Sequence, residues 1–120
     1  MSLNNILNEA IDKIAGAQFA GVVGTDGLSV EMVYAGGGAD LDLEIADIEL
    51  ATVAANAAAA SDRIGSGVVR DIMVESDDLT YLASMITRGY YAVLGVRSNG
   101  NLGRARFAVR QMVERMKDEL

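Results

Sequence analysis

Hydrophobic residues near the start of the chain recur at helical spacing. They stand at i, i+3, i+4 and i+7 along one stripe, which is typical of an amphipathic helix, and Gly16 follows as a stop signal. The stripe consists of Leu3, Ile6, Leu7, Ala10, Ile11 and Ile14. The sequence therefore predicts a first helix over residues 3–14.

Two β-prone runs follow, at residues 19–24 and 28–34. Thr25-Asp26-Gly27 lies between them, and Asp-Gly favours the backbone angles of a tight hairpin turn. We therefore expect a β-hairpin. Residues 35–39 contain three consecutive glycines and are expected to form a connection without regular structure.

The alanine-rich segment 44–64 predicts a long helix that begins near Leu43. Its early acids, Glu44, Asp47 and Glu49, complement the positive end of a helix dipole, and Gly65 follows as a termination signal. Three more β-prone runs, joined by short polar links, predict a meander over residues 68–75, 79–87 and 90–97. A last apolar stripe, from Leu102 to Leu120, predicts a closing helix.

The predicted fold class is α+β, in a single domain over residues 1–120 with the element order α-β-β-α-β-β-β-α. Links between successive strands are short, so the five strands should form an antiparallel sheet flanked by helices. The link at residues 88–89 is too short for a parallel crossover.

The long helix has two apolar faces on a helical wheel. One carries Ala46, Leu50, Val53, Ala57, Ala60 and Ile64 and is expected to face the sheet. The opposite face carries Ile48, Ala51, Ala55, Ala58 and Ala59. Small side chains at four-residue spacing allow close helix packing, so we expect this face to pair with its copy in a second chain. The alternative is that alanine, a good helix former, simply covers an exposed face.

Composition and charge exclude several classes of function and structure. The 120 residues are 51% hydrophobic and include no Cys, which suits one core without disulfides and makes the cytoplasm the expected location. We expect no cleaved leader and no membrane insertion, since the most apolar stretch is too short to span a bilayer. The net charge of −7 argues against general nucleic-acid binding, although five of the ten basic residues lie between positions 104 and 117. These should form a solvated basic face.

Local motifs resemble those of the Roadblock/dynein light-chain family over essentially the whole chain. They are residues 21–28 (GVVGTDGL), the alanine-rich helix, residues 70–75 (RDIMVE), residues 91–96 (YAVLGV) and residues 101–103 (NLG). The resemblance implies a profilin-like Roadblock architecture, in which the third strands of two chains pair edge to edge and the long helices pack together. With the wheel, it gives a homodimer interface formed by Ile48, Ala51, Ala55, Ala58, Ala59, Val69, Asp71 and Met73.

The resemblance also implies a function. Family members regulate or scaffold Ras-like small GTPases, or serve as light chains that attach cargo to motors. Bacterial members related to gliding-motility protein B bind a small GTPase and can stimulate its hydrolysis. The leading hypothesis is therefore a homodimeric GTPase regulator, with Glu44, Asp47, Asp62 and Arg63 as docking residues. A nucleotide-independent scaffold or light-chain-type adaptor is the alternative, and a ligand sensor is a third class.

Catalytic, cofactor and metal signatures are weak. The chain has no His and no Cys, and the glycines at 36–38 lack the Lys-Ser/Thr ending of a phosphate-binding loop. Asp40, Asp42 and Glu44 resemble the start of a calcium loop, but Ile45 occupies its required glycine position. We expect no enzyme activity, no cofactor and no metal site. Phe107 lies away from the buried stripe of its helix, which indicates either a partner contact or a later helix start.

Overall fold

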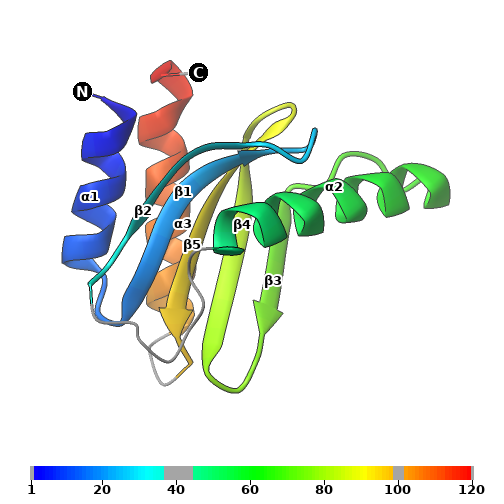
Figure 1. Cartoon of the computed structure of the whole chain (residues 1–120). Helices are drawn as coiled ribbons and strands as arrows, with labels where there is room; N and C mark the ends of the chain where they lie inside the picture. Colours follow the sequence, from blue (N-terminus) through cyan, green and yellow to red (C-terminus); the bar gives the residue numbers. More distant parts are fainter. Residues whose placement is uncertain (1, 37–44, 99–101, 120) are drawn as a thin grey trace.

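The predicted order of elements is confirmed in the structure, a computed structural model that describes residues 2–36, 45–98 and 102–119 (Figure 1). The helices are α1 (Leu3–Lys13), α2 (Ala46–Ile64) and α3 (Leu102–Met116), and a short 3-10 helix, η2 (Lys117–Glu119), follows α3. The strands are β1 (Ala17–Gly24), β2 (Ser29–Tyr34), β3 (Asp71–Glu75), β4 (Leu79–Thr87) and β5 (Tyr90–Arg97).

The strands form one antiparallel sheet in the order β2-β1-β5-β4-β3. Its central strand is β5, which pairs with β1 on one side and β4 on the other, and β2 and β3 are the two edges. The predicted hairpin closes through Asp26, whose side chain accepts a hydrogen bond of 3.1 Å from the backbone N–H of Leu28. The expected antiparallel pairing of the last two strands is also confirmed.

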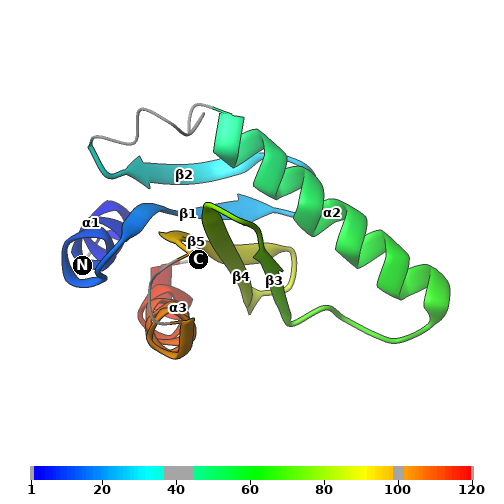
Figure 2. The same cartoon turned by 90° about the horizontal axis from the view of Figure 1, so that it is seen from below.

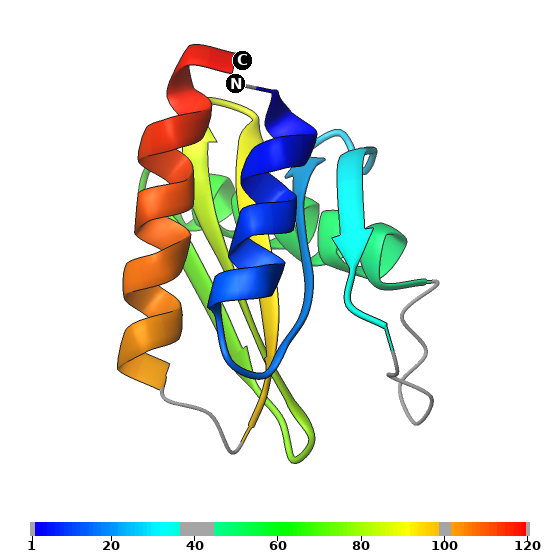
Figure 3. The ribbon, with the colours of Figure 1, turned by 90° about the vertical axis from the view of Figure 1, so that its left-hand side faces the viewer.

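Helices cover both faces of the sheet. Figures 2 and 3 show α1 and α3 side by side on one face and α2 alone on the other. The α1/α3 face encloses the larger core, in which Leu7, Leu94 and Met116 are completely buried. The α2 face encloses a smaller core around Phe19, Tyr91 and Val93.

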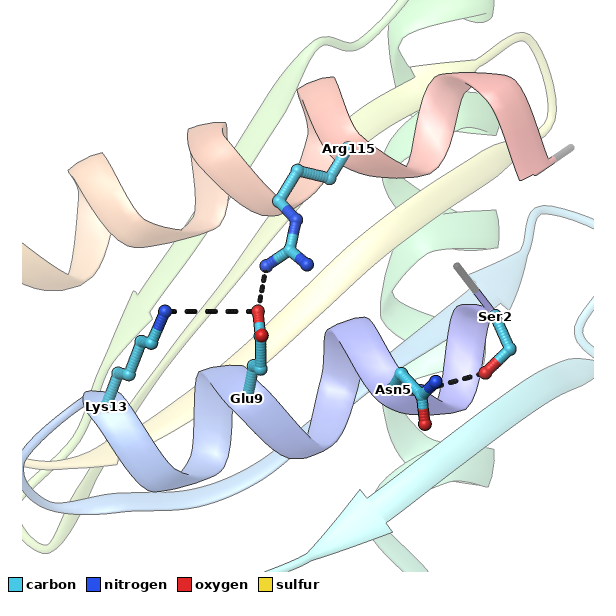
Figure 4. A network of polar contacts seen from close by, with 5 residues as sticks. All are labelled: Ser2, Asn5, Glu9, Lys13 and Arg115. Atoms are coloured by element: carbon cyan, nitrogen blue, oxygen red, sulfur yellow. Dashed lines mark hydrogen bonds and ion pairs between the residues drawn. The ribbon is translucent and has the colours of Figure 1, made fainter.

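Polar contacts add to the packing between α1 and α3. Glu9 of α1 accepts a hydrogen bond from the guanidinium of Arg115 in α3, and the Lys13 Nζ lies 3.9 Å from the same carboxylate (Figure 4). The hydrogen bond and the positive charge of Arg115 lower the pKa of the Glu9 carboxyl below its ordinary value of 4.5, with a further contribution from Lys13. At the start of α1, the Ser2 hydroxyl caps the helix by accepting from the Asn5 N–H at 3.2 Å.

Phe19 fixes the spacing of strands beneath α2. Its ring lies over Gly95, its partner residue on β5, and a Cβ added to Gly95 would approach the ring carbons to 2.1 Å. Phe19 itself is only 1% exposed. A glycine is therefore required at position 95 for the aromatic ring to fill the core of the α2 face.

Several predicted boundaries differ from the structure by one or more residues, and two of them, at the starts of α2 and β3, bear on the site. Helix α2 begins at Ala46, since Ile45 is in a 3-10 turn, and the predicted start at Leu43 and the acid Glu44 lie outside the described residues. Strand β3 begins at Asp71 and not at Val68. Strand β3 starts later because α2 ends beyond the sheet. Residues 66–70 connect the end of α2 back to the sheet, and pairing with β4 begins after them (Figure 1).

The predicted orientation of α2 was right for Leu50, which faces the sheet, but wrong for Ala51. Leu50, Ala51 and Ala54 are 6%, 0% and 1% exposed against the sheet, whereas Ile64, expected to face the sheet, is 79% exposed. Ala51 therefore belongs to the chain's own core and not to an outer face. The wheel failed because small apolar residues occur all around this helix, and because it crosses the sheet obliquely, so that only its first half lies over the strands (Figure 2).

None of the helices within the described ranges is both long and apolar enough to cross a membrane.

Candidate interaction site

The second half of α2 projects beyond the sheet. Figures 1 and 2 show it extending past β3, and Gly65 ends it in the left-handed conformation at φ +81°, as the sequence predicted. Ala55 and Ala58 are half-buried and Ala59 is exposed on this half of the helix. This uncharged, small-residue surface lies where an exposed helix would normally carry polar side chains, which is typical of a contact surface.

Two large apolar side chains are exposed near the two ends of α2. Ile48 is 60% exposed near the start of α2, and Ile64 is 79% exposed at its last residue. Burying either side chain in a complex would contribute about 1.5–3 kcal/mol by the hydrophobic effect. Ile48 and Ile64 point to different sides of the helix, because sixteen residues at 3.6 per turn make about four and a half turns. Both are left uncovered by the chain's own sheet.

Strand β3 provides an unpaired sheet edge next to the projecting helix. Among the residues that the structure describes, it pairs only with β4, from Asp71 opposite Ser84 to Glu75 opposite Thr80. Ile72 packs into the core under α2, so the alternation of a strand places Asp71 and Met73 on the α3 side. An edge strand presents free backbone donors and acceptors along its open side, and these can pair with another strand.

The segment that enters β3 is held in place by Tyr91 of β5. The Tyr91 hydroxyl donates a hydrogen bond to the backbone carbonyl of Val69, and the Val69 side chain packs against the core under α2. Burial raises the pKa of the Tyr91 hydroxyl, and the negative charge of Asp71 raises it further. The Met85 N–H also donates to the Arg70 carbonyl at 2.8 Å. These two hydrogen bonds therefore fix the entry to β3 within the single chain.

The predicted docking charges do not lie together. Asp47 is half-buried in the first turn of α2, and Asp62 and Arg63 are exposed in its last turn. Asp62 follows Asp47 by fifteen positions along the helix, roughly 22 Å at 1.5 Å per residue. Glu44 lies outside the described residues. The charges therefore cannot form one compact binding site, although they mark both ends of the apolar surface.

This site has few features of a small-molecule or metal-binding site. A shallow hollow of about 220 Å³ lies near the start of α2, between Phe19, Ile45 and Tyr81, and is smaller than most ligand pockets. Within residues 2–36, 45–98 and 102–119, no three His, Cys, Asp or Glu side chains are grouped as metal ligands would be. The surface of α2 and the edge of β3 have the character of a protein-binding site.

Sequence reasoning assigned most of the outer α2 residues to the exposed side but missed Ala54. Ala54 is 1% exposed and follows Leu50 by four residues. Leu50 was correctly assigned to the sheet, so the position four residues after it was the available signal for Ala54. The exposed position of Phe107, which is 61% exposed on α3, agrees with its predicted place outside the buried stripe.

This arrangement is the Roadblock/LC7 fold. MglC from Myxococcus xanthus is similar at 29% sequence identity over 100% of both chains, with a TM-score of 0.74. A Roadblock/LC7 domain from Streptomyces avermitilis matches at 18% identity over 99% of this chain and 98% of its own, with a TM-score of 0.78. The gliding protein MglB from Thermus thermophilus matches at 16% identity over 98% and 90% of the two chains, with a TM-score of 0.79.

No protein-family model matches the chain, and no curated protein matches its sequence.

Proposed function

We propose that this chain, with its Roadblock/LC7 fold, is a non-enzymatic homodimeric module that binds a Ras-like small GTPase and modulates its nucleotide state or hydrolysis. The observation that carries the dimer is the second half of α2, which extends past the sheet edge formed by β3 (Figure 1). The regulatory part rests on the fold and on the resemblance of the sequence motifs to Roadblock proteins.

Pairing of β3 with β3 of a second copy explains why α2 extends past its own sheet. The strand pair would continue the sheet across a two-fold axis, and the projecting half of each α2 would then lie over the partner's strands. Ala55, Ala58 and Ala59 would allow the two helices to approach closely. The same contact would cover Ile64, which is 79% exposed in the single chain.

The dimer surface can be tested with Ala59→Glu, because Ala59 is exposed and a glutamate there leaves the chain's own core intact. Sedimentation velocity should show a shift from dimer to monomer, since the carboxylate would be buried without a partner. Val30→Glu is the matched control: it places a charge on the other edge strand, β2, at a side chain that is 46% exposed. A dimer that persists in Ala59→Glu, or that Val30→Glu dissociates equally, contradicts the proposed interface.

Binding of a GTPase can be tested with a small GTPase encoded in the same genome, loaded with GDP or with a non-hydrolysable GTP analogue. A regulator should bind one nucleotide state more tightly than the other. Asp62→Lys and Arg63→Glu should weaken that binding if the last turn of α2 contacts the GTPase. Absence of binding in both states contradicts the GTPase hypothesis.

A nucleotide-independent scaffold is the second candidate, and the distance between Asp47 and Asp62 favours it. Recognition of a loop that changes with the bound nucleotide favours a compact charged site. A surface without one is better suited to a large contact area with other proteins of an assembly. Equal binding of the GDP and GTP-analogue forms in the same assay would support the scaffold over the regulator.

A further inference from the structure

We propose that a groove between α3 and β3, on the sheet face opposite α2, binds an extended acidic peptide segment of another protein. The groove consists of two adjoining hollows of about 240 and 350 Å³, which share Asp71 of β3 and Arg110 of α3. This inference does not rest on the proposed function, because it concerns the other face of the sheet.

The groove has an apolar floor and a basic rim. Met73, Leu82 and Val109 line the first hollow, and the Met73 side chain is 47% exposed there. Arg106 and Arg110 stand one turn apart on the α3 rim of this hollow, and Arg70 and Lys117 line the second hollow. Apolar side chains below a line of cations suit a strand whose side chains alternate between hydrophobic and acidic.

The rim has more positive charge than the fold itself neutralises. Arg110 lies 3.8 Å from the Asp71 carboxylate, and Lys117 lies 3.0 Å from Glu114. Arg70 and Arg106 form no ion pair within the parts of the chain that the structure describes. Two guanidinium groups are therefore available to a partner in a chain whose net charge is −7. This local excess is complementary to carboxylates.

The ion pair of Arg110 is easily exchanged. Its side chain is 64% exposed, and exposed pairs at this distance contribute little to stability. Asp71 has a second, closer partner, because the Ser84 hydroxyl donates to its carboxylate at 2.6 Å. Arg110 can thus turn toward a carboxylate of the bound peptide while Ser84 continues to satisfy Asp71. Arginine is well suited to this because it pairs with carboxylates through two parallel N–H donors.

The groove favours a peptide over other anionic ligands. Each hollow is at or below the lower end of the volumes that enclose a small molecule, so an elongated ligand fits better than a compact one. Nucleic acid is disfavoured because no aromatic side chain among the described residues lines either hollow for base stacking.

The groove and the proposed dimer contact both involve β3 but use different parts of it. The dimer would pair the open backbone edge of β3, which includes Asp71 and Met73, whereas the peptide would contact the side chains of these two residues on the α3 side. Dimerisation would bring the grooves of two chains to the same face of a continuous sheet.

The test is binding of a short fluorescein-labelled peptide of alternating glutamate and leucine to the full chain, measured by fluorescence anisotropy. We expect saturable binding, and no binding of the peptide with lysine in place of glutamate or of a single-stranded oligonucleotide of equal charge. Arg106→Glu and Arg70→Glu should each weaken binding about tenfold or more, as expected for loss of a charge-assisted hydrogen bond.

Arg88→Glu is the matched control, since it makes the same charge change at an exposed residue in the β4–β5 turn, outside the groove. An equal loss of peptide affinity in Arg88→Glu would show that the peptide binds by non-specific charge attraction, and would overturn the proposal. Preferential binding of the oligonucleotide would also overturn it. Amide chemical shifts give a second readout. Peptide-induced changes at residues 70–73 and 106–113 support the groove, and changes confined to α2 overturn it.

Discussion

The two faces of the sheet differ in how completely the chain covers them. Among the described residues, the core beneath α1 and α3 contains sixteen buried residues, and the core beneath α2 contains eight. The α1/α3 face has two helices that support each other, whereas α2 lies alone and half of it has no sheet below it (Figure 2). The comparison indicates that one face supplies stability within the chain, while the other is suited to a partner.

The largest expected effect is on the α1/α3 face. Leu94→Ala removes a side chain that is fully buried in the larger core and leaves a cavity. The free energy of unfolding, measured by urea denaturation, should fall by about 3 kcal/mol. Leu28→Ala is the control, because that leucine is 66% exposed. An equal effect of the two variants would mean that this face does not carry the stability assigned to it.

A second variant probes the α2 face from the next residue along the same strand. Gly95→Ala places a Cβ against the buried Phe19 ring at 2.1 Å, so that the ring and α2 must shift. Unfolding free energy should fall by about 2 kcal/mol, as for other overpacked cores. Gly36→Ala, where an added Cβ meets nothing within 4 Å, should be nearly neutral. If Gly95→Ala also leaves the unfolding free energy unchanged, the core under α2 can accommodate an added methyl group and is not tightly packed.

The entry to β3 should respond more weakly. Tyr91→Phe keeps the ring but removes the hydrogen bond to the Val69 carbonyl, so the unfolding free energy should fall by about 1 kcal/mol. Hydrogen exchange at residues 69–71 should become faster, because this segment loses its tie to β5. Tyr90→Phe is the control at a neighbouring ring that is 40% exposed. Unchanged exchange in Tyr91→Phe would show that side-chain packing alone holds the segment.

The smallest expected effect concerns pH and the contact between α1 and α3. Because the pKa of Glu9 is lowered in the folded chain, its pairing with Arg115 stabilises the fold above pH 4.5, and this contribution is lost as pH falls through the lowered pKa. The difference in unfolding free energy between the wild type and Glu9→Gln should therefore disappear in acid. Arg115→Gln should produce the same pH dependence. A difference that persists in acid would indicate a packing effect.

Much of the fold could be predicted because its signals are local. The apolar stripe from Leu3 to Ile14 and the Asp26-Gly27 turn each specify an element regardless of their surroundings. Rotation of α2 could not be predicted in the same way, since alanine contributes similar hydrophobicity on every side of a helix. Ala51 was assigned to the wrong face for this reason, whereas Ile64 is exposed because α2 runs past the sheet.

The candidate site was less predictable because it depends on tertiary arrangement. The spacing of Asp47 and Asp62 along one helix was visible in the sequence, but their place relative to the sheet edge was not. Arg70 and Arg110 are far apart in the sequence and come to one groove only because β3 lies beneath α3. The sequence identified a basic final helix but not the apolar floor that accompanies it.

The pairing of β1 with β5 at the centre of the sheet has a consequence for synthesis on the ribosome. Ala17 of β1 lies opposite Val96 of β5, so the middle of the sheet cannot close until most of the chain has emerged. Until then, the apolar side chains of the β1–β2 hairpin and of the alanine-rich helix stay exposed, because β5 is not yet there to bury them. Nascent chains of this protein should therefore be most dependent on chaperones just before β5 leaves the exit tunnel.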